Sequence, residues 1–414
     1  MGRKNQQQPV EGQNLKAPEP FPADLLQQPK GARIAYFERE CLIMHTRLEE
    51  VCRAVMRSIC MPGDDMFHRG LGSMVLVIGP TRVGKTKLIE VLEKELLKRA
   101  QERMLQDPGY IPFASVTTDV GEWGRFDWMD YYPAVLEQLH DPFLRASKNY
   151  WMPARDVKNA MIEALVHRKT QVVIVDEAHH LARAGNRGQR LHSNLDHLKY
   201  FENKTGVSHV LVGTYAMRPF RKASAQLALR TIDVHFSRYD ATKEEDRIAF
   251  KSALWALQRQ IPVEEEPQLR PHWEFLYARS NGCIGALKQH LNQALRLALD
   301  ENAKTVTLEH LKKTAVSKDK VDLALMDIIS GEQDLAEPVD ADEQLLKNLG
   351  LVASEPSEEK KSEAAAGGQE QAAVPRSQHG RKPKPGERAL GRDPIGTSHE
   401  AQDRESDAAD QLAG

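Results

Sequence analysis

Short apolar runs alternate with longer amphipathic stretches along the middle of the chain. The runs rich in β-branched residues lie at 74–78, 111–117, 172–175, 207–213 and 232–236. Their length and composition are typical of buried strands. The stretches between them repeat apolar residues at helical spacing, so they predict helices that each bury one side. This alternation predicts an α/β fold in which a parallel sheet carries helices on both faces.

Helical spacing also continues on either side of this core. Before it, the apolar positions between 34 and 59 predict one long amphipathic helix. After it, a second, helical unit is predicted, with segments at 243–259, 267–280, 285–300 and 307–316. Thr307 is a residue type that caps helices, so we expect it to open the last of these segments.

Composition shifts divide the chain further. The first 30 residues are rich in Gln, Pro and Gly, and the residues after 351 are rich in Glu, Ala, Ser, Gln and Gly. Neither end carries enough apolar residues to build a core, so both predict flexible or disordered tails. We therefore expect an arm at 1–30, a helical segment at 31–68, the α/β core at 69–240, the helical lid at 241–318, a partly helical extension at 319–351 and a disordered tail at 352–414.

Charge and cysteine content exclude several classes of protein. The formal net charge is −2, so any nucleic-acid-binding surface must be local. The four cysteines form no C-x-x-C pair and indicate neither a zinc ribbon nor a disulfide framework. No apolar run approaches the ~20 residues that span a bilayer, and the polar start does not resemble a signal peptide. The sequence predicts a cytoplasmic protein with no membrane partner.

The first apolar run leads into a phosphate-binding motif with the spacing G-x-x-x-x-G-K-T. Two glycines at such positions allow a tight turn whose amide groups converge on an anion, beside the positive end of a helix dipole. Lysine then reaches the β- and γ-phosphates, and the final hydroxyl is placed to ligate Mg²⁺. The predicted nucleotide-binding residues are Gly79, Pro80, Thr81, Val83, Gly84, Lys85 and Thr86.

Two later strands end in polar residues that complement this loop. Asp176 and Glu177 follow the run at 172–175, where Asp176 is placed to hold Mg²⁺ and Glu177 to polarise the attacking water. Thr214 ends the next run. Carboxyl ends of parallel strands meet at one edge of the sheet, so Thr214 is placed to contact the γ-phosphate or that water. The pattern predicts an ATPase.

Two other groups of polar and aromatic residues each allow two interpretations of their role. The aromatic and basic loop at 121–128 either grips nucleic acid or anchors itself to the core. The candidate DNA contacts in and near it are Arg125, Lys148 and Arg155. His179 and His180 are adjacent and point in different directions, so we favour a structural role for them over a metal site.

The order of these parts resembles the AAA+ class of P-loop ATPases. Within that class, residues 60–316 are similar to the TniB/TnsC group of transposition regulators and, more distantly, to the MuB and IstB ATPases. The resemblance is carried by DEAHHL at 176–181, LKYFEN at 198–203, LVGT at 211–214 and SNGCIGALK at 280–288.

The resemblance implies roles for two further residues. Arg230 occupies the position of the group's arginine finger, which reaches the γ-phosphate bound to a neighbouring subunit. Lys288 occupies the position of the group's sensor residue in the lid. Arg218, Arg221 and Arg238 compete with Arg230 for the first role. It also implies ATP and Mg²⁺ as cofactors, a homo-oligomeric ring or filament on duplex DNA in a bacterial cytoplasm, and transposase and TniQ/TnsD-like target-selector proteins as partners.

Two other outputs of such an ATPase stay open. A replication initiator or helicase loader also assembles on DNA, and an initiator carries a winged helix after the lid. The residues past 316 are poor in strand-forming sequence. A STAND-type switch binds protein instead and usually carries sensor repeats, whereas this chain shows no internal repeat.

Overall fold

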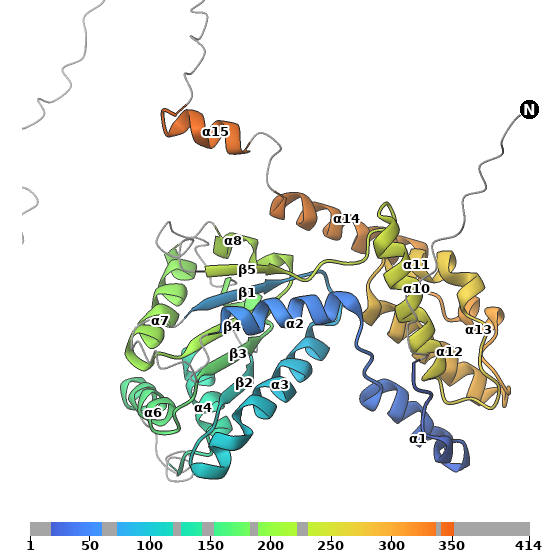
Figure 1. Ribbon diagram of the computed structural model, residues 1–414, viewed down its shortest axis with the longest axis horizontal. Helices are drawn as coiled ribbons and strands as arrows, with labels where there is room; N and C mark the ends of the chain where they lie inside the picture. The colour runs from blue at the N-terminus through green and yellow to red at the C-terminus, as the bar shows by residue number, and fades with distance from the viewer. Residues whose placement is uncertain are drawn as a thin grey trace, which may run out of the picture. The chain divides into compact units, whose positions relative to one another are not determined.

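The computed structural model describes residues 18–59, 73–118, 126–142, 153–182, 189–221, 231–336 and 341–351. Contacts divide the chain into two units, 1–341 and 342–414, which are treated separately below. The first unit holds the sheet, the helices packed on it and the lid (Figure 1). Among the described residues, no helix is both long and apolar enough to cross a membrane.

A parallel sheet forms the centre of the first unit. Its strands are β1 (Met74–Ile78), β2 (Phe113–Thr117), β3 (Val172–Asp176), β4 (Ser208–Gly213) and β5 (Thr231–His235). Their order in the sheet is β2-β3-β4-β1-β5, and each neighbouring pair is parallel. The strand that precedes the phosphate loop therefore lies between β4 and β5, and the five predicted strands are confirmed to within two residues at their ends.

Side chains alternate between the two faces of β1, so each face has its own core. Met74, Leu76 and Ile78 pack into one apolar cluster, while Val75 and Val77 pack into the other. The first cluster is covered by α4 (Trp128–Gln138), α6 (Ala154–His167) and α7 (Gln189–Thr205). The second is covered by α2 (Thr46–Ser58) and α3 (Lys85–Gln106), as Figure 1 shows.

The single long helix expected over 34–59 is two helical segments. The first comprises α1 (Lys30–Ala35) and a π-helical turn η2 (Tyr36–Glu40), and the second is α2. Phe37 and Cys41 pack into the lid, whereas Leu48 and Val55 pack onto the sheet. One straight helix cannot reach both cores, so the chain breaks between them even though the apolar period continues.

The lid surrounds a third apolar cluster. Its helices are α10 (Glu244–Arg259), α11 (Trp273–Ser280), α12 (Ile284–Asp300) and α13 (Leu308–Lys313), and a short turn, η5 (Arg270–His272), precedes α11. Thr307 caps α13, and its side chain accepts from the His310 amide. Figure 1 shows α1 beside the lid, although the two lie far apart in the sequence.

A further helix, α14 (Lys318–Leu335), leaves the lid and returns to the core. It packs against η4 (Tyr215–Met217) and α8 (Arg218–Arg221), the turns that follow β4. At the start of the chain, η1 (Ala23–Gln27) precedes α1, and η3 (Ala178–Ala182) follows β3. The second unit begins within α15 (Ala341–Asn348), and the structure describes it up to residue 351.

Candidate nucleotide-binding site

The phosphate loop connects the end of β1 to the start of α3. Gly84 is the residue before α3 and has φ = 124°, a conformation open to glycine and strained for other residues. Arg82 has φ = 63°, so this arginine also holds the left-handed conformation. The Gly79 amide donates to the Gly213 carbonyl at 3.2 Å, which joins the loop to the end of β4. A strained non-glycine residue such as Arg82 is typical of a functional turn.

Lys85 lies inside this loop. Its side chain is buried, and Nζ donates to the Pro80 carbonyl at 2.8 Å and towards the Gly79 carbonyl at 3.4 Å. Burial lowers the pKa of Lys85, while the negative charges of Glu177 and Asp176 oppose that shift. The ammonium group therefore lies in the field of the two acids. Thr86, the next residue of α3, is exposed.

Asp176 and Glu177 end β3 in a turn. The Glu177 amide donates to Asp176 Oδ1 at 2.7 Å, and Glu177 itself has φ = 52°. Burial, together with the charge of Glu177, raises the pKa of Asp176, while the Glu177 amide opposes that shift. A left-handed glutamate costs roughly 1–2 kcal/mol, so its neighbours must hold it in place.

Two residues whose roles the sequence did not indicate hold this turn. Thr118 Oγ1 donates to the carbonyls of Asp176 and Glu177 at 3.0 and 2.8 Å, because parallel pairing sets Thr117 beside Asp176. His179 Nδ1 lies 2.9 Å from Glu177 Oε2, so the imidazole borders the carboxylate. The sequence signal for Thr118 is its position after the neighbouring strand, and His179 comes two residues after Glu177 in the DEAHHL stretch.

Thr214 follows β4 at the same edge of the sheet. Residue pairing sets Ile78 beside Gly213, so the start of the phosphate loop and Thr214 are neighbours. Its hydroxyl accepts from the Ala216 amide at 3.4 Å, which caps η4. Thr214 is partly exposed.

The lid docks on the phosphate loop through the first turn of α12. The Ala286 amide donates to the Arg82 carbonyl at 3.0 Å. Gly285 makes this approach possible, because a Cβ at that position would overlap the same carbonyl. Lys288, one turn further on, does not point into open solvent: its Nζ donates to the backbone carbonyls of Cys41 at 2.6 Å and Glu38 at 3.2 Å.

The three arginines that compete for the finger role are bonded within the chain. Arg218 pairs with Asp334, and Arg238 pairs with Glu332 at 3.0 Å, both on α14. Arg221 pairs with Asp233 on β5. Arg230 lies outside the described residues.

Of the candidate DNA contacts, Arg155 is exposed near the start of α6, and Arg125 and Lys148 lie outside the described residues. Phe126 and Trp128 pack against the core, so the anchoring reading of that loop is confirmed for these two aromatics.

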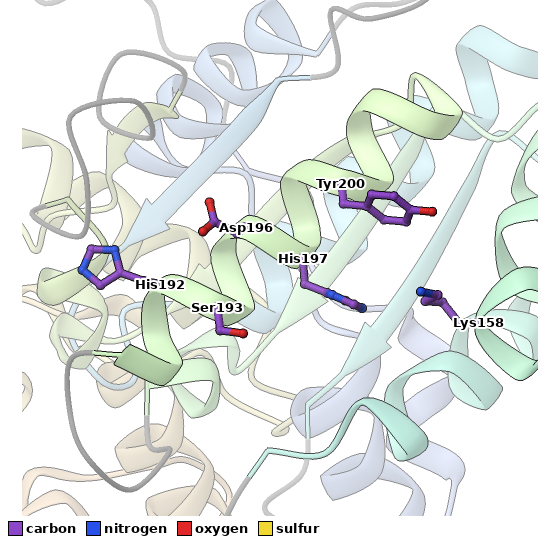
Figure 2. Close-up of a pocket in the computed structure, with 6 residues that line it drawn as sticks. All are labelled: Lys158, His192, Ser193, Asp196, His197 and Tyr200. Carbon is purple, nitrogen blue, oxygen red and sulfur yellow. The ribbon is translucent and has the colours of Figure 1, made fainter. Parts of the chain in front are cut away.

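A cavity of about 550 Å³ lies between α6 and α7, lined by Lys158, His192, Ser193, Asp196, His197 and Tyr200 (Figure 2). In Figure 2, His197 and Tyr200 extend towards Lys158, while His192 and Asp196 point elsewhere.

Known protein families and solved structures were compared with this chain. Residues 68–220 match the family model described as an AAA domain. No curated protein matches the sequence. The ORC2 protein of Aeropyrum pernix matches with 14% identity and TM-score 0.48, over 78% of this chain and 91% of that one. The Cdc6p of Pyrobaculum aerophilum matches with 14% identity and TM-score 0.48, over 73% and 74%. A Drosophila ORC structure, described as bound to DNA, matches with 13% identity and TM-score 0.44, over 85% and 88%.

The matched region includes strands β1 to β4, the phosphate loop, and Asp176 and Glu177 at the end of β3, while β5 lies beyond it. Residues 68–220 form an AAA domain, and the predicted fold class is confirmed. This domain is a P-loop ATPase domain.

Proposed function

We propose that this ATPase is an ATP-dependent, DNA-binding regulator of transposition. In this proposal it assembles on duplex target DNA and recruits or activates a transposase, and a target-selecting protein decides where assembly starts. The observation that supports it is the docking of the lid entry, SNGCIGALK at 280–288, on Arg82 of the phosphate loop. A stretch that carries the family resemblance is thus the one that connects lid and nucleotide site.

Each site residue has a role in this proposal. Lys85 binds the β- and γ-phosphates of ATP, which would replace the loop carbonyls that now hold its Nζ. Thr86 and Asp176 supply the oxygen ligands that Mg²⁺ prefers. Glu177, whose carboxylate lies beside His179, polarises the attacking water, and Thr214 contacts the γ-phosphate or that water. Bound nucleotide supplies the phosphoanhydride bond that is hydrolysed.

Arg230 is proposed as the finger that completes the site of a neighbouring subunit. The ion pairs of the other three candidates support this choice. Arg218 and Arg238 pair with residues of α14, and Arg221 pairs with a residue of β5. Freeing Arg218 or Arg238 for another subunit would leave Asp334 or Glu332 without its ion pair. An interfacial site couples nucleotide state to assembly, since the γ-phosphate then contacts two subunits.

The described residues beyond the lid bear on the initiator alternative. Over 317–336 and 341–351 the chain forms α14 and α15, and this part of it contains no strand. A winged helix needs a strand hairpin, so the described part of the extension does not favour an initiator.

Electron microscopy of negatively stained protein tests the proposal. Duplex DNA is added with ADP or with a non-hydrolysable ATP analogue, and we expect rings or filaments on DNA only with the analogue. The same oligomers are then tested for stimulation of a purified transposase. Oligomers that form equally with ADP would contradict nucleotide control, and monomers under both conditions would favour a protein-binding switch.

A further inference from the structure

The end of the first helical segment lies between the two helices that border the nucleotide site. Residues 30–40 form α1 and the turn η2, and the Cys41 amide closes the last turn on the Tyr36 carbonyl at 2.9 Å. A helix end leaves carbonyls without partners inside the helix and carries partial negative charge, so it favours cations.

Two lysines from different elements occupy those carbonyls. Lys288 of α12 donates to the Glu38 and Cys41 carbonyls at 3.2 and 2.6 Å, and Lys87 of α3 donates to the Arg39 carbonyl at 2.9 Å. We call this arrangement, formed by Lys87, Lys288 and the carbonyls of residues 38, 39 and 41, the lysine clamp.

Further contacts fix the lysine clamp in place. Arg296, two turns after Lys288 on α12, pairs with the Glu38 carboxylate at 2.6 Å. Lys87 also pairs with Glu90 at 2.8 Å. Burial lowers the pKa of Lys288, as expected for an ammonium group withdrawn from water.

The clamp lies close to the phosphate loop on both sides. Lys87 comes two residues after Lys85 in the first turn of α3, and Lys288 comes two residues after Ala286, whose amide holds the Arg82 carbonyl. The N-terminal segment therefore joins the loop helix to the lid at the place where the two meet. Loss of either lysine frees one side of this joint.

We propose that Lys288 is a positioning residue that sets the lid against the phosphate loop through the N-terminal segment, and that it does not sense the γ-phosphate. A γ-phosphate sensor contributes to binding of ATP and not of ADP. A residue that positions the lid contributes to both, because the lid closes on the same loop for either nucleotide.

Equilibrium binding of fluorescent ATP and ADP analogues to the full chain separates these roles. Lys288→Met loses two charge-assisted hydrogen bonds, so we expect both Kd values to rise about tenfold and their ratio to stay within about twofold of wild type. Lys87→Met should change both Kd values in the same direction. A selective loss of ATP binding in Lys288→Met, or no change in either Kd, would overturn the proposal.

Two further variants guard against a folding defect. Lys288→Arg keeps a cation that reaches the same carbonyls, and it should restore most of the affinity for both nucleotides. Lys304→Met removes an exposed lysine beyond the opposite end of α12 and should leave both Kd values unchanged. Loss of affinity in Lys304→Met equal to that in Lys288→Met would mean that any lid lysine matters, which would overturn the specific role of the clamp. The measurement needs no DNA or transposase, so its outcome is independent of the proposed function.

Discussion

Glu177 shows how a single side chain is prepared at this site. Its backbone holds a left-handed conformation, its amide is bonded to Asp176 and its carboxylate lies beside His179. The Thr118 hydroxyl donates to the two backbone carbonyls of the same turn. The hydrogen bonds of Thr118 and Asp176 hold this strained turn in place, as the proposed water-polarising role of Glu177 requires.

We therefore predict that Glu177→Gln keeps nucleotide binding and slows hydrolysis by a factor of about 10² or more. The amide has nearly the shape of the carboxylate and lacks its basicity. Single-turnover hydrolysis and nucleotide binding, measured on the same preparation, check this. Unchanged turnover would show that another group activates the water.

His45 gives stability a pH dependence. Its ring is buried, Nδ1 lies 2.9 Å from the Tyr239 hydroxyl, and burial with the nearby Arg47 lowers its pKa from 6.5 to about 4. The folded state thus binds the proton less readily than the unfolded state. The neutral ring contributes its full stability above pH 6.5, and this is lost as pH falls towards 4.

The predicted loss from this group is about 1 kcal/mol per pH unit within that window. Urea denaturation at several pH values measures it. His45→Gln should flatten the dependence, though not remove it, because burial also lowers the pKa of His197, His235 and His290. His192→Gln, at an exposed position, is the matched control and should leave the slope unchanged. An unaltered slope in His45→Gln would contradict the assignment.

At the scale of elements, α14 approaches the core most closely at Gly331, in addition to its ion pairs through Glu332 and Asp334. Gly331 lies against the ring of buried Tyr215, and a Cβ there would overlap that ring. The Tyr215 hydroxyl is in turn 3.0 Å from His235 Nε2 on β5, so the ring is held on its far side. The ring cannot move away without breaking this hydrogen bond.

Gly331→Ala should therefore destabilise the protein by about 1–3 kcal/mol, the usual effect of overpacking. Gly31→Ala is the matched control, because Gly31 lies in α1 with nothing within 4 Å of an added Cβ. That change should be neutral or stabilising by up to about 1 kcal/mol. The denaturant midpoints of the two variants are compared. Equal midpoints would show that α14 shifts to accept the added Cβ with no loss in the free energy of unfolding.

The elements also show why much of this fold followed from the sequence and some did not. Strand positions and the site residues Lys85, Asp176 and Glu177 carry local signals, namely apolar runs and fixed spacing. The break at 41–45 carries none, because the apolar period between Phe37 and Leu48 is uninterrupted, and only the separation of two cores imposes it. Contacts such as that of Lys288 with Cys41 join residues far apart in the chain, which periodicity does not encode.

At the scale of the whole molecule, the proposed assembly makes each site a product of two subunits. Lys85→Ala removes the phosphate-binding lysine and should abolish both ATP binding and ATP-dependent DNA binding. Arg230→Ala keeps that lysine and should lose hydrolysis only. Persistent ATP-stimulated DNA binding in Lys85→Ala would contradict the coupling of nucleotide to assembly.

Mixing the two inactive variants tests the shared site directly. In a random mixture of equal parts, a site works when an Arg230→Ala subunit, with its intact loop, receives the intact Arg230 of a Lys85→Ala neighbour. Random assembly would put about a quarter of the sites in this condition, and Lys85→Ala subunits assemble less well because they bind no ATP. The mixture should therefore regain measurable hydrolysis, at most roughly a quarter of the wild-type rate. Hydrolysis by the mixture on DNA is the measurement, and Arg238→Ala in place of Arg230→Ala is the control. Since Arg238 is paired with Glu332 in its own chain and Arg238→Ala keeps Arg230, this variant should hydrolyse ATP by itself, and mixing it with Lys85→Ala should only dilute that activity. A mixture of Lys85→Ala and Arg230→Ala that stays inactive would mean that Arg230 does not act across subunits.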